Sequence, residues 1–270
     1  MILELCISVT LLALCWGSFL NVIAYRITYD KPFFAPRSQC PSCSTIIAWY
    51  DNIPLLSWFL LRGKCRTCKT PISWVYPFIE FITALTFLTL VIVHLKEKQE
   101  KYLYPLDWSM ISLTPLIPYF VFFSALILAT ASDLFAMVIP QLFSVWLIPV
   151  GLLFALYDKL AISPLESIIG CMTGYGILLF TEIVFKRLTK KEGIGVGDME
   201  LLAMIGSFLG PIGVWTSLMI GTLSGIACGS GYLVLSKQGK NTRIPFGPFL
   251  SLGAIMYVLF KNTIIKFFFF

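Results

Sequence analysis

The sequence is poor in charged residues and has only one sizeable polar segment. Only 13% of its 270 residues are Asp, Glu, Lys or Arg, whereas 58% are hydrophobic, and the mean hydropathy is +0.86. Soluble domains carry about 25% charged residues, so this shortage excludes an ordinary water-soluble domain. The net charge of +6 requires no nucleic-acid partner, because basic loops beside a lipid bilayer explain it. We therefore predict an all-α polytopic membrane protein.

The apolar residues form runs that predict about eight transmembrane helices, since a spanning helix needs roughly 20 mainly apolar residues. The sixth run is short, because its twelve residues cover only about 18 Å of a roughly 30 Å core. We keep it as a span because the basic joint at residues 237–244 would otherwise lie outside. The eight runs are Ile2–Tyr25, Val75–Leu95, Ser109–Ala131, Val138–Tyr157, Pro164–Phe185, Met199–Gly210, Ile212–Leu235 and Phe246–Phe260.

The distribution of basic residues predicts the orientation. Fourteen Lys and Arg residues lie in the joints at 26–73, 186–197 and 237–244, against six on the other side, so these joints are expected in the cytoplasm. The first run has no basic residue before it and no small-residue cleavage site after it, so we expect a retained span. We predict a first helix (1–25), a cytoplasmic cysteine domain (26–74), a second helix with an external loop (75–108), a six-helix core (109–260) and a C-terminal tail (261–270).

The polar segment between the first two predicted spans contains a C-x2-C-x21-C-x2-C pattern formed by Cys40, Cys43, Cys65 and Cys68. Four thiolates from two tight turns can form a tetrahedral structural zinc site. A segment of about 48 residues can barely build its own core, so a metal ion would supply stability. The alternatives are four reduced thiols or two redox-active dithiols, and the expected cytoplasmic location disfavours stable disulfides.

Two aspartates at the ends of apolar runs are the strongest candidates for catalysis, because ionisable groups beside membrane helices are costly. Asp133 follows the third run, at the unfavourable negative end of a helix dipole, and Asp198 precedes the sixth, where an ordinary N-cap is the alternative. Both lie on the predicted cytoplasmic side and can therefore meet. By contrast, a capping box accounts for Glu166, and a helix-face pair with Lys186 accounts for Glu182.

Two carboxylates in one site can act as acid and base on a water molecule that attacks a peptide carbonyl. The helix-end fields favour Asp198 as the ionised base and Asp133 as the protonated acid, although the two titrations are coupled. Gly195 and Gly197 would form the active-site loop, because glycine lets a backbone approach a substrate strand closely.

The order of motifs along the chain resembles that of the prepilin peptidases, the GxGD class of aspartyl peptidases. Asp133 with Ile139-Pro140 is similar to the family's first catalytic segment, and Gly195-Val196-Gly197-Asp198 to its second. The family often has Asp and Lys where this chain has Gln141 and Glu200. The other matching segments are Gly17–Val22, Tyr25-Arg26, Pro36–Ser38, Cys40–Cys43, Trp49–Trp58, Leu61–Cys65, Tyr76-Pro77, Glu80 and Ile244–Phe249.

This resemblance implies a bifunctional enzyme of the bacterial inner membrane. It would remove the basic leader of prepilins or pseudopilins after a glycine at the cytoplasmic face, and then methylate the new N-terminal amine. The methyl donor would be S-adenosylmethionine, and methyl transfer is associated with the cysteine domain. Motif position suggests Gly63, Asp51 and Glu80 for this step, since no glycine-rich nucleotide loop marks a donor site.

Two other functions fit parts of the pattern. A membrane thiol oxidoreductase would use the two C-x2-C pairs and would not need the aspartates. A transporter or scaffold would use the aspartates to bind a cation or proton and the cysteine domain to dock a partner. The oxidoreductase would lose its activity with the cysteines, and the transporter or scaffold would cleave no pilin-like peptide.

Overall fold

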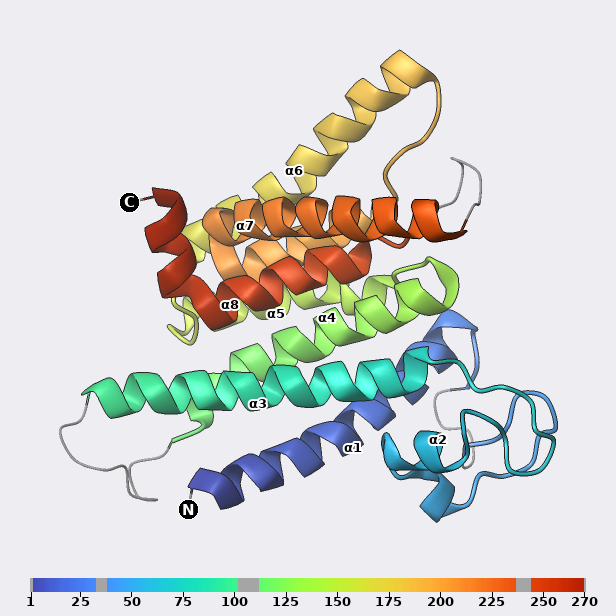
Figure 1. Ribbon diagram of the computed structural model, residues 1–270. Coiled ribbons are helices and arrows are strands. Elements are labelled where there is room, and N and C mark those ends of the chain that lie inside the picture. The colour runs from blue at the N-terminus through green and yellow to red at the C-terminus, as the bar shows by residue number, and fades with distance from the viewer. Residues whose placement is uncertain (1, 33–37, 102–111, 237–243, 270) are drawn as a thin grey trace. The chain divides into compact units, whose positions relative to one another are not determined.

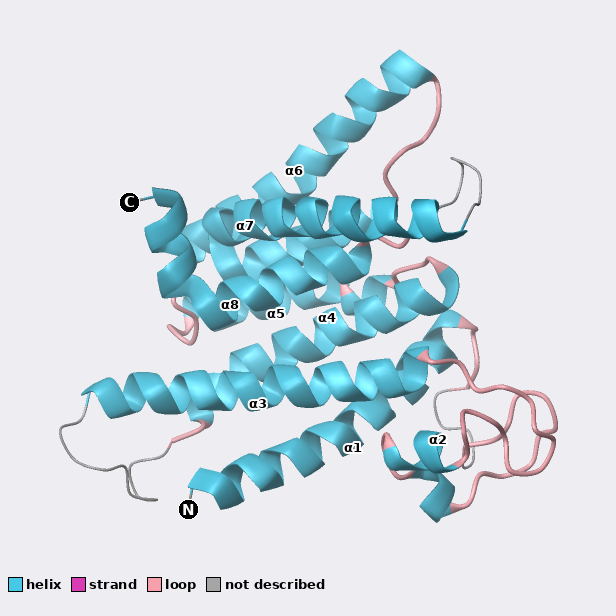
Figure 2. Cartoon of the chain, viewed as in Figure 1, coloured by secondary structure: helices cyan, strands magenta, loops and turns pink. Residues whose placement is uncertain are grey.

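The computed structural model describes residues 2–32, 38–101, 112–236 and 244–269 (Figure 1). Within these ranges the chain forms helices and loops, with no strand and only two isolated bridges, so the predicted all-α class is confirmed (Figure 2). The chain divides into two compact units, Met1–Thr114 and Pro115–Phe270. Pro36, Arg37 and the basic joint at 237–243 lie outside the described residues.

In the first unit, α1 (Ile2–Thr28) and α3 (Val75–Lys101) pack against each other. Their close approach depends on Gly17, where a Cβ atom would lie 2.9 Å from the Thr83 Cβ atom and 3.0 Å from the Glu80 Cα atom. The buried Asn21 side chain donates to the Tyr76 carbonyl at 3.0 Å, which joins the two helices further along. The segment between them contains η1 (Trp49–Asn52) and α2 (Leu56–Leu60).

The second unit is built around the long helix α7. A Cβ atom at Gly170 on α6 would collide with the Gly206 carbonyl on α7, so only small residues permit this close crossing. Helix α8 lies along α7, and a Cβ atom at Gly253 would approach the Ser217 carbonyl to 2.5 Å (Figure 1). The elements are η3 (Thr114–Leu116), α4 (Ile117–Ala136), η4 (Gln141–Phe143), η5 (Val145–Leu147), α5 (Ile148–Leu156), α6 (Pro164–Thr189), α7 (Val196–Ser236) and α8 (Gly247–Phe269).

Five helices among the described residues are long and apolar enough to cross a membrane, which identifies a multi-pass membrane protein. They are Ile2–Thr28, Val75–Gln99, Thr114–Ala136, Pro164–Thr189 and Val196–Gly231, and Gln141–Leu156 and Gly247–Lys261 are shorter apolar helices. The predicted count of eight is therefore not confirmed.

Three local features explain the difference in count. Helix α7 breaks at Gly210, whose φ of 71° is followed by Pro211, and this break falls between the predicted sixth and seventh spans. The predicted fourth span is not a single helix, because two 3-10 turns precede the nine-residue α5. Helix α8 has a break at Phe260 and continues to Phe269.

Candidate functional site

Asp133 lies in the last turn of α4 and is only 5% exposed. Its Oδ2 atom accepts a hydrogen bond of 2.9 Å from the backbone N–H of Gly247, the first residue of α8. Such N-terminal amides have no partner within their own helix, so the carboxylate supplies one. Gly247 lies in the matching segment Ile244–Phe249, but the sequence alone did not mark it as a site residue. The available signal was Gly247-Pro248, because proline is common at the first helical positions.

Asp198 is half-buried in the first turn of α7. The helix begins at Val196, so Asp198 is not an N-cap, and its N–H donates to the Gly195 carbonyl at 3.1 Å. A Cβ atom at Gly195 would lie 3.4 Å from the Asp198 Oδ2 atom. A carboxylate in a first turn is stabilised by the helix dipole.

Ile139 connects the segments that carry the two aspartates. A Cβ atom at Gly197 would lie 3.1 Å from the Ile139 Cβ atom, and one at Gly247 would lie 3.0 Å from its Cδ1 atom. The carboxylates of Asp133 and Asp198 are close enough to interact electrostatically. Packing within the second unit therefore brings both candidate aspartates to one place, although they are far apart in the sequence.

Glu182 on α6 holds the loop that precedes Asp198. Its carboxylate accepts hydrogen bonds from the backbone N–H groups of Gly193 and Ile194, at 3.1 and 2.8 Å. Lys186, which we expected to pair with Glu182, instead forms an ion pair of 2.9 Å with Glu192. The expected helix-face pair is thus replaced by a contact that positions the start of the Gly195–Asp198 segment.

The two residues that depart from the prepilin peptidase pattern contact each other. The Gln141 Nε2 atom donates to the Glu200 Oε1 atom at 3.1 Å, and the Ser144 hydroxyl donates to Glu200 Oε2 at 3.3 Å. These bonds join the turns after α4 to the beginning of α7. Because Glu200 lies two residues after Asp198, they also restrain the turn that carries this aspartate.

The four predicted cysteine ligands converge, and their Sγ atoms all lie within 4.8 Å of one another. The Sγ atoms of Cys40 and Cys68 are 3.7 Å apart, close to the roughly 3.8 Å edge of a tetrahedron with metal–sulfur bonds of about 2.3 Å. All four are free thiols in the structure. The group can therefore hold a metal ion, and the approach of Cys40 to Cys68, from the other C-x2-C pair, favours one shared site over two separate dithiol pairs.

The two cysteine turns repeat one local geometry. The Cys40 N–H donates to the Thr45 carbonyl at 3.0 Å, and the Cys65 N–H donates to the Thr70 carbonyl at 2.9 Å. The Cys68 sulfur also lies 3.1 Å from the Thr70 hydroxyl, and hydrogen bonds from the Thr70 side chain and backbone lower the pKa of Cys68 to about 6. A lowered pKa favours the thiolate, which is the form that binds metals.

The three residues predicted for methyl transfer each contact a neighbour within the first unit. Gly63 has a φ of 64°, and a Cβ atom there would lie 2.9 Å from the Trp58 ring. Asp51 accepts two hydrogen bonds of 2.7 and 2.6 Å from Arg66, and these bonds lower the pKa of Asp51. The buried Glu80 carboxylate accepts the Leu55 N–H at 2.8 Å. Their role in methyl transfer stays a prediction.

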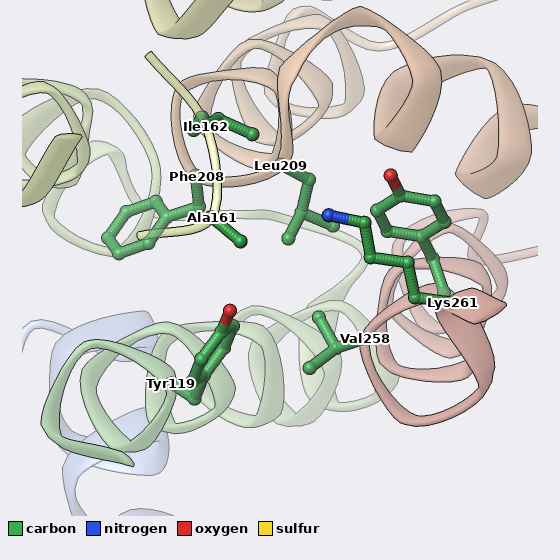
Figure 3. A pocket seen from close by; sticks show the side chains of 8 residues that line it. Tyr119, Ala161, Ile162, Phe208, Leu209, Val258 and Lys261 are labelled. Carbon is green, nitrogen blue, oxygen red and sulfur yellow. The ribbon is translucent and has the colours of Figure 1, made fainter. Parts of the chain in front are cut away.

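Figure 3 shows a pocket that is lined by residues of α4, α7, α8 and the loop before α6. Tyr119 comes from the first turn of α4, whereas Asp133 lies in the last turn of the same helix. Neither Asp133 nor Asp198 lines the pocket. Its lining residues are Tyr119, Ala161, Ile162, Phe208, Leu209, Tyr257, Val258 and Lys261.

Comparisons with known proteins match nearly the whole chain. Residues 11–94 match the Bacterial Peptidase A24 N-terminal domain, and residues 120–234, which include both aspartates, match the Type IV leader peptidase family. A prepilin leader peptidase/N-methyltransferase from Aeromonas hydrophila is 33% identical over 96% of this chain and 91% of its own length. A protein of the same name from Pectobacterium carotovorum subsp. carotovorum is 31% identical over 93% and 91%.

A Type 4 prepilin-like proteins leader peptide-processing enzyme from Escherichia coli O78:H11 is 30% identical over 88% of each chain. No solved structure matches this chain. The identities reach 33%, and the coverage extends across both units, so the likeness is not confined to one shared helix pair. This chain therefore belongs to the type IV leader peptidase family.

Proposed function

We propose that this chain is an aspartyl endopeptidase that removes the leader of type IV prepilins or pseudopilins and then methylates the new N-terminal amine. The observation that carries the proposal is the meeting of Asp133 and Asp198 beside Ile139. The names of the relatives, prepilin leader peptidase/N-methyltransferase, support both activities. The four converging cysteines can hold a metal ion, so the cysteine segment needs no redox function.

The aspartate pair supplies the acid and the base for peptide hydrolysis. One ionised carboxylate accepts a proton from water while the water oxygen attacks the scissile carbonyl carbon. The protonated partner donates its proton to the carbonyl oxygen. The tetrahedral intermediate then collapses: the first carboxyl group gives its proton to the peptide nitrogen, the C–N bond breaks, and the second carboxylate takes back a proton from a hydroxyl of the intermediate.

The roles of the two aspartates depend on their helix ends. From the sequence we expected Asp198 to be the base and Asp133 the acid, because Asp133 lies at the negative end of α4. The hydrogen bond from Gly247 also places Asp133 at the positive end of α8. Both carboxylates therefore lie near positive helix ends, so the helix-end fields no longer distinguish the base from the acid.

Cleavage would follow a glycine at the end of the basic leader, at the cytoplasmic face of the bacterial inner membrane. Fourteen of the 20 basic residues lie in the joints predicted to face the cytoplasm, which supports this orientation. Asp198 directly follows the joint at 186–197, and Asp133 accepts a hydrogen bond from Gly247, which lies shortly after the joint at 237–244. A prepilin could therefore keep its apolar helix in the bilayer while its leader reaches the pair.

The cysteine group would hold one structural zinc ion, with Cys40, Cys43, Cys65 and Cys68 as its ligands. When bound, S-adenosylmethionine would supply an electrophilic methyl group to the new N-terminal amine. Gly63, Asp51 and Glu80 are the residues that we propose for this step. The purified protein should contain about one zinc ion per chain, and replacing a ligand cysteine should lower that content.

The aspartyl mechanism is tested by mass measurement of a co-expressed prepilin with a Gly-Phe junction. The wild type should remove the leader and add one methyl group, whereas Asp133→Asn and Asp198→Asn should leave the leader intact. Asp158→Asn is a matched control, because Asp158 is exposed in the same unit and its φ of 51° suits asparagine. Cleavage that survives in either of the first two variants, at matched protein levels, would exclude the pair.

A further inference from the structure

Helix α2 in the cysteine segment has its polar side inward and its apolar side outward. Ser57 is buried, and its hydroxyl donates to the Tyr50 carbonyl at 2.9 Å. Leu56, Phe59 and Leu60 are 51%, 65% and 73% exposed. Residues three and four apart lie on one face of a helix, so these three form an apolar outer face. A helix that faces water shows the reverse arrangement.

Two tryptophans of the same segment are also exposed, Trp49 at 72% and Trp74 at 59%. Trp58 differs from both, because its indole N–H donates to the Ile72 carbonyl at 3.2 Å and its ring covers Gly63. Single exposed apolar side chains are common, but several within a segment this small indicate an interaction surface. Tryptophan in particular is enriched where a protein meets the membrane–water boundary.

Contacts with α3 hold this surface at the beginning of a membrane-length helix. Trp74 directly precedes Val75, the first residue of α3. Glu80, in the second turn of α3, accepts the N–H of Leu55, which directly precedes α2. Leu55 has a φ of 60°, an uncommon conformation for leucine, so the hydrogen bond fixes a specific path into α2. Helix α2 is therefore level with the first turns of a helix that enters the bilayer.

The charge of the segment fits an anionic surface. Arg62, Lys64 and Lys69 are exposed, whereas Asp51 is already paired with Arg66. Basic residues beside a membrane helix attract anionic lipids. We propose that the interfacial face, defined as Leu56, Phe59, Leu60, Trp49 and Trp74, inserts into the headgroup boundary of an anionic phospholipid bilayer and anchors the cysteine segment there.

This proposal is tested with the full-length protein in phosphatidylglycerol-containing vesicles, with or without brominated acyl chains. Bromine quenches tryptophan fluorescence at short range. The emission of one residue is obtained as the difference between the wild type and a single variant, Trp49→Phe or Trp74→Phe. Trp58→Phe is the internal control, since Trp58 faces into the segment. Variants are compared only when their metal content equals that of the wild type.

Trp49 and Trp74 should lose a larger share of their emission in brominated vesicles than Trp58, and dissolved iodide should quench them little. Replacing phosphatidylglycerol by phosphatidylcholine should weaken the bromine quenching. Equal quenching of all three tryptophans, or strong quenching of Trp49 and Trp74 by iodide, would overturn the proposal. A shift in their emission only when a prepilin is added would assign the face to a protein partner instead, and would also overturn it.

Discussion

Replacing Gly247 by alanine tests whether the amide of α8 positions the Asp133 carboxylate. The backbone of Gly247 is not in the left-handed region, so alanine can adopt it without strain. The new Cβ atom would lie 2.9 Å from Asp133 Oδ2, closer than real Cβ atoms approach, and 3.0 Å from Ile139 Cδ1. Ile139 also packs on Gly197 and has little room to shift. The Asp133 carboxylate is therefore the group that must move away from the new Cβ atom.

The size of the effect follows from this distance. Ordinary contact requires the carboxylate to retreat by about 0.5 Å, which lengthens its 2.9 Å hydrogen bond from Gly247. Hydrogen bonds to charged groups contribute about 1.5–3 kcal/mol, and each 1.4 kcal/mol corresponds to a tenfold change in rate. We expect kcat/KM for leader removal to fall by roughly 10- to 100-fold, since misplacement of a catalytic group by a fraction of an ångström is costly.

The assay is the initial rate of leader removal by the purified enzyme in vesicles, followed by mass spectrometry. Gly176→Ala is the matched control, because a Cβ atom at Gly176 on α6 meets no atom within 4 Å. The control should cleave at the wild-type rate, and both variants should unfold at the wild-type temperature. A Gly247→Ala enzyme that is folded and as active as the control would refute the positioning role of Gly247.

Three further predictions concern residues around the two sites. Glu182→Ala removes the carboxylate that accepts the amide hydrogens of Gly193 and Ile194. The cleavage rate should therefore fall, and these two amides should exchange hydrogen with solvent faster than in the wild type. Unchanged exchange would contradict the role of Glu182. Glu200→Lys should lower the cleavage rate roughly 2- to 10-fold, and adding Gln141→Asp should restore much of it through a new ion pair; a double variant no better than the single would exclude coupling. Arg66 lowers the pKa of Asp51 in the folded protein below the ordinary aspartate value of about 4. The ion pair therefore stabilises the segment that carries the cysteines at pH values above about 4. This stabilisation is lost as the pH falls through the lowered pKa of Asp51. Protease resistance of the segment should therefore differ between wild type and Asp51→Asn at neutral pH and converge in acid, and a constant difference would contradict the pair's role.

Features that depend on neighbours a few residues away were predictable from the sequence. The capping box of Ser163 and Glu166 is present, with a 2.7 Å bond from the Ser163 N–H to the Glu166 carboxylate. The break at Gly210 and Pro211 divides α7 between the predicted sixth and seventh spans. The four cysteines converge as their spacing indicated. Caps, breaks and C-x2-C turns are determined by local backbone geometry, which the order of residues specifies directly.

The long-range partners of the acidic residues were decided by the tertiary structure alone. Gly247 donates a hydrogen bond to Asp133, and Gln141 donates one to Glu200. Glu182 accepts the amide hydrogen of Ile194 and does not pair with a residue on its own helix. The sequence by itself determined that the chain is apolar and helical, and it predicted that two aspartates lie on the same side of the membrane. It could not determine which helix ends meet, because that depends on the close packing of glycine-lined helices, where each contact is made only after the others have formed.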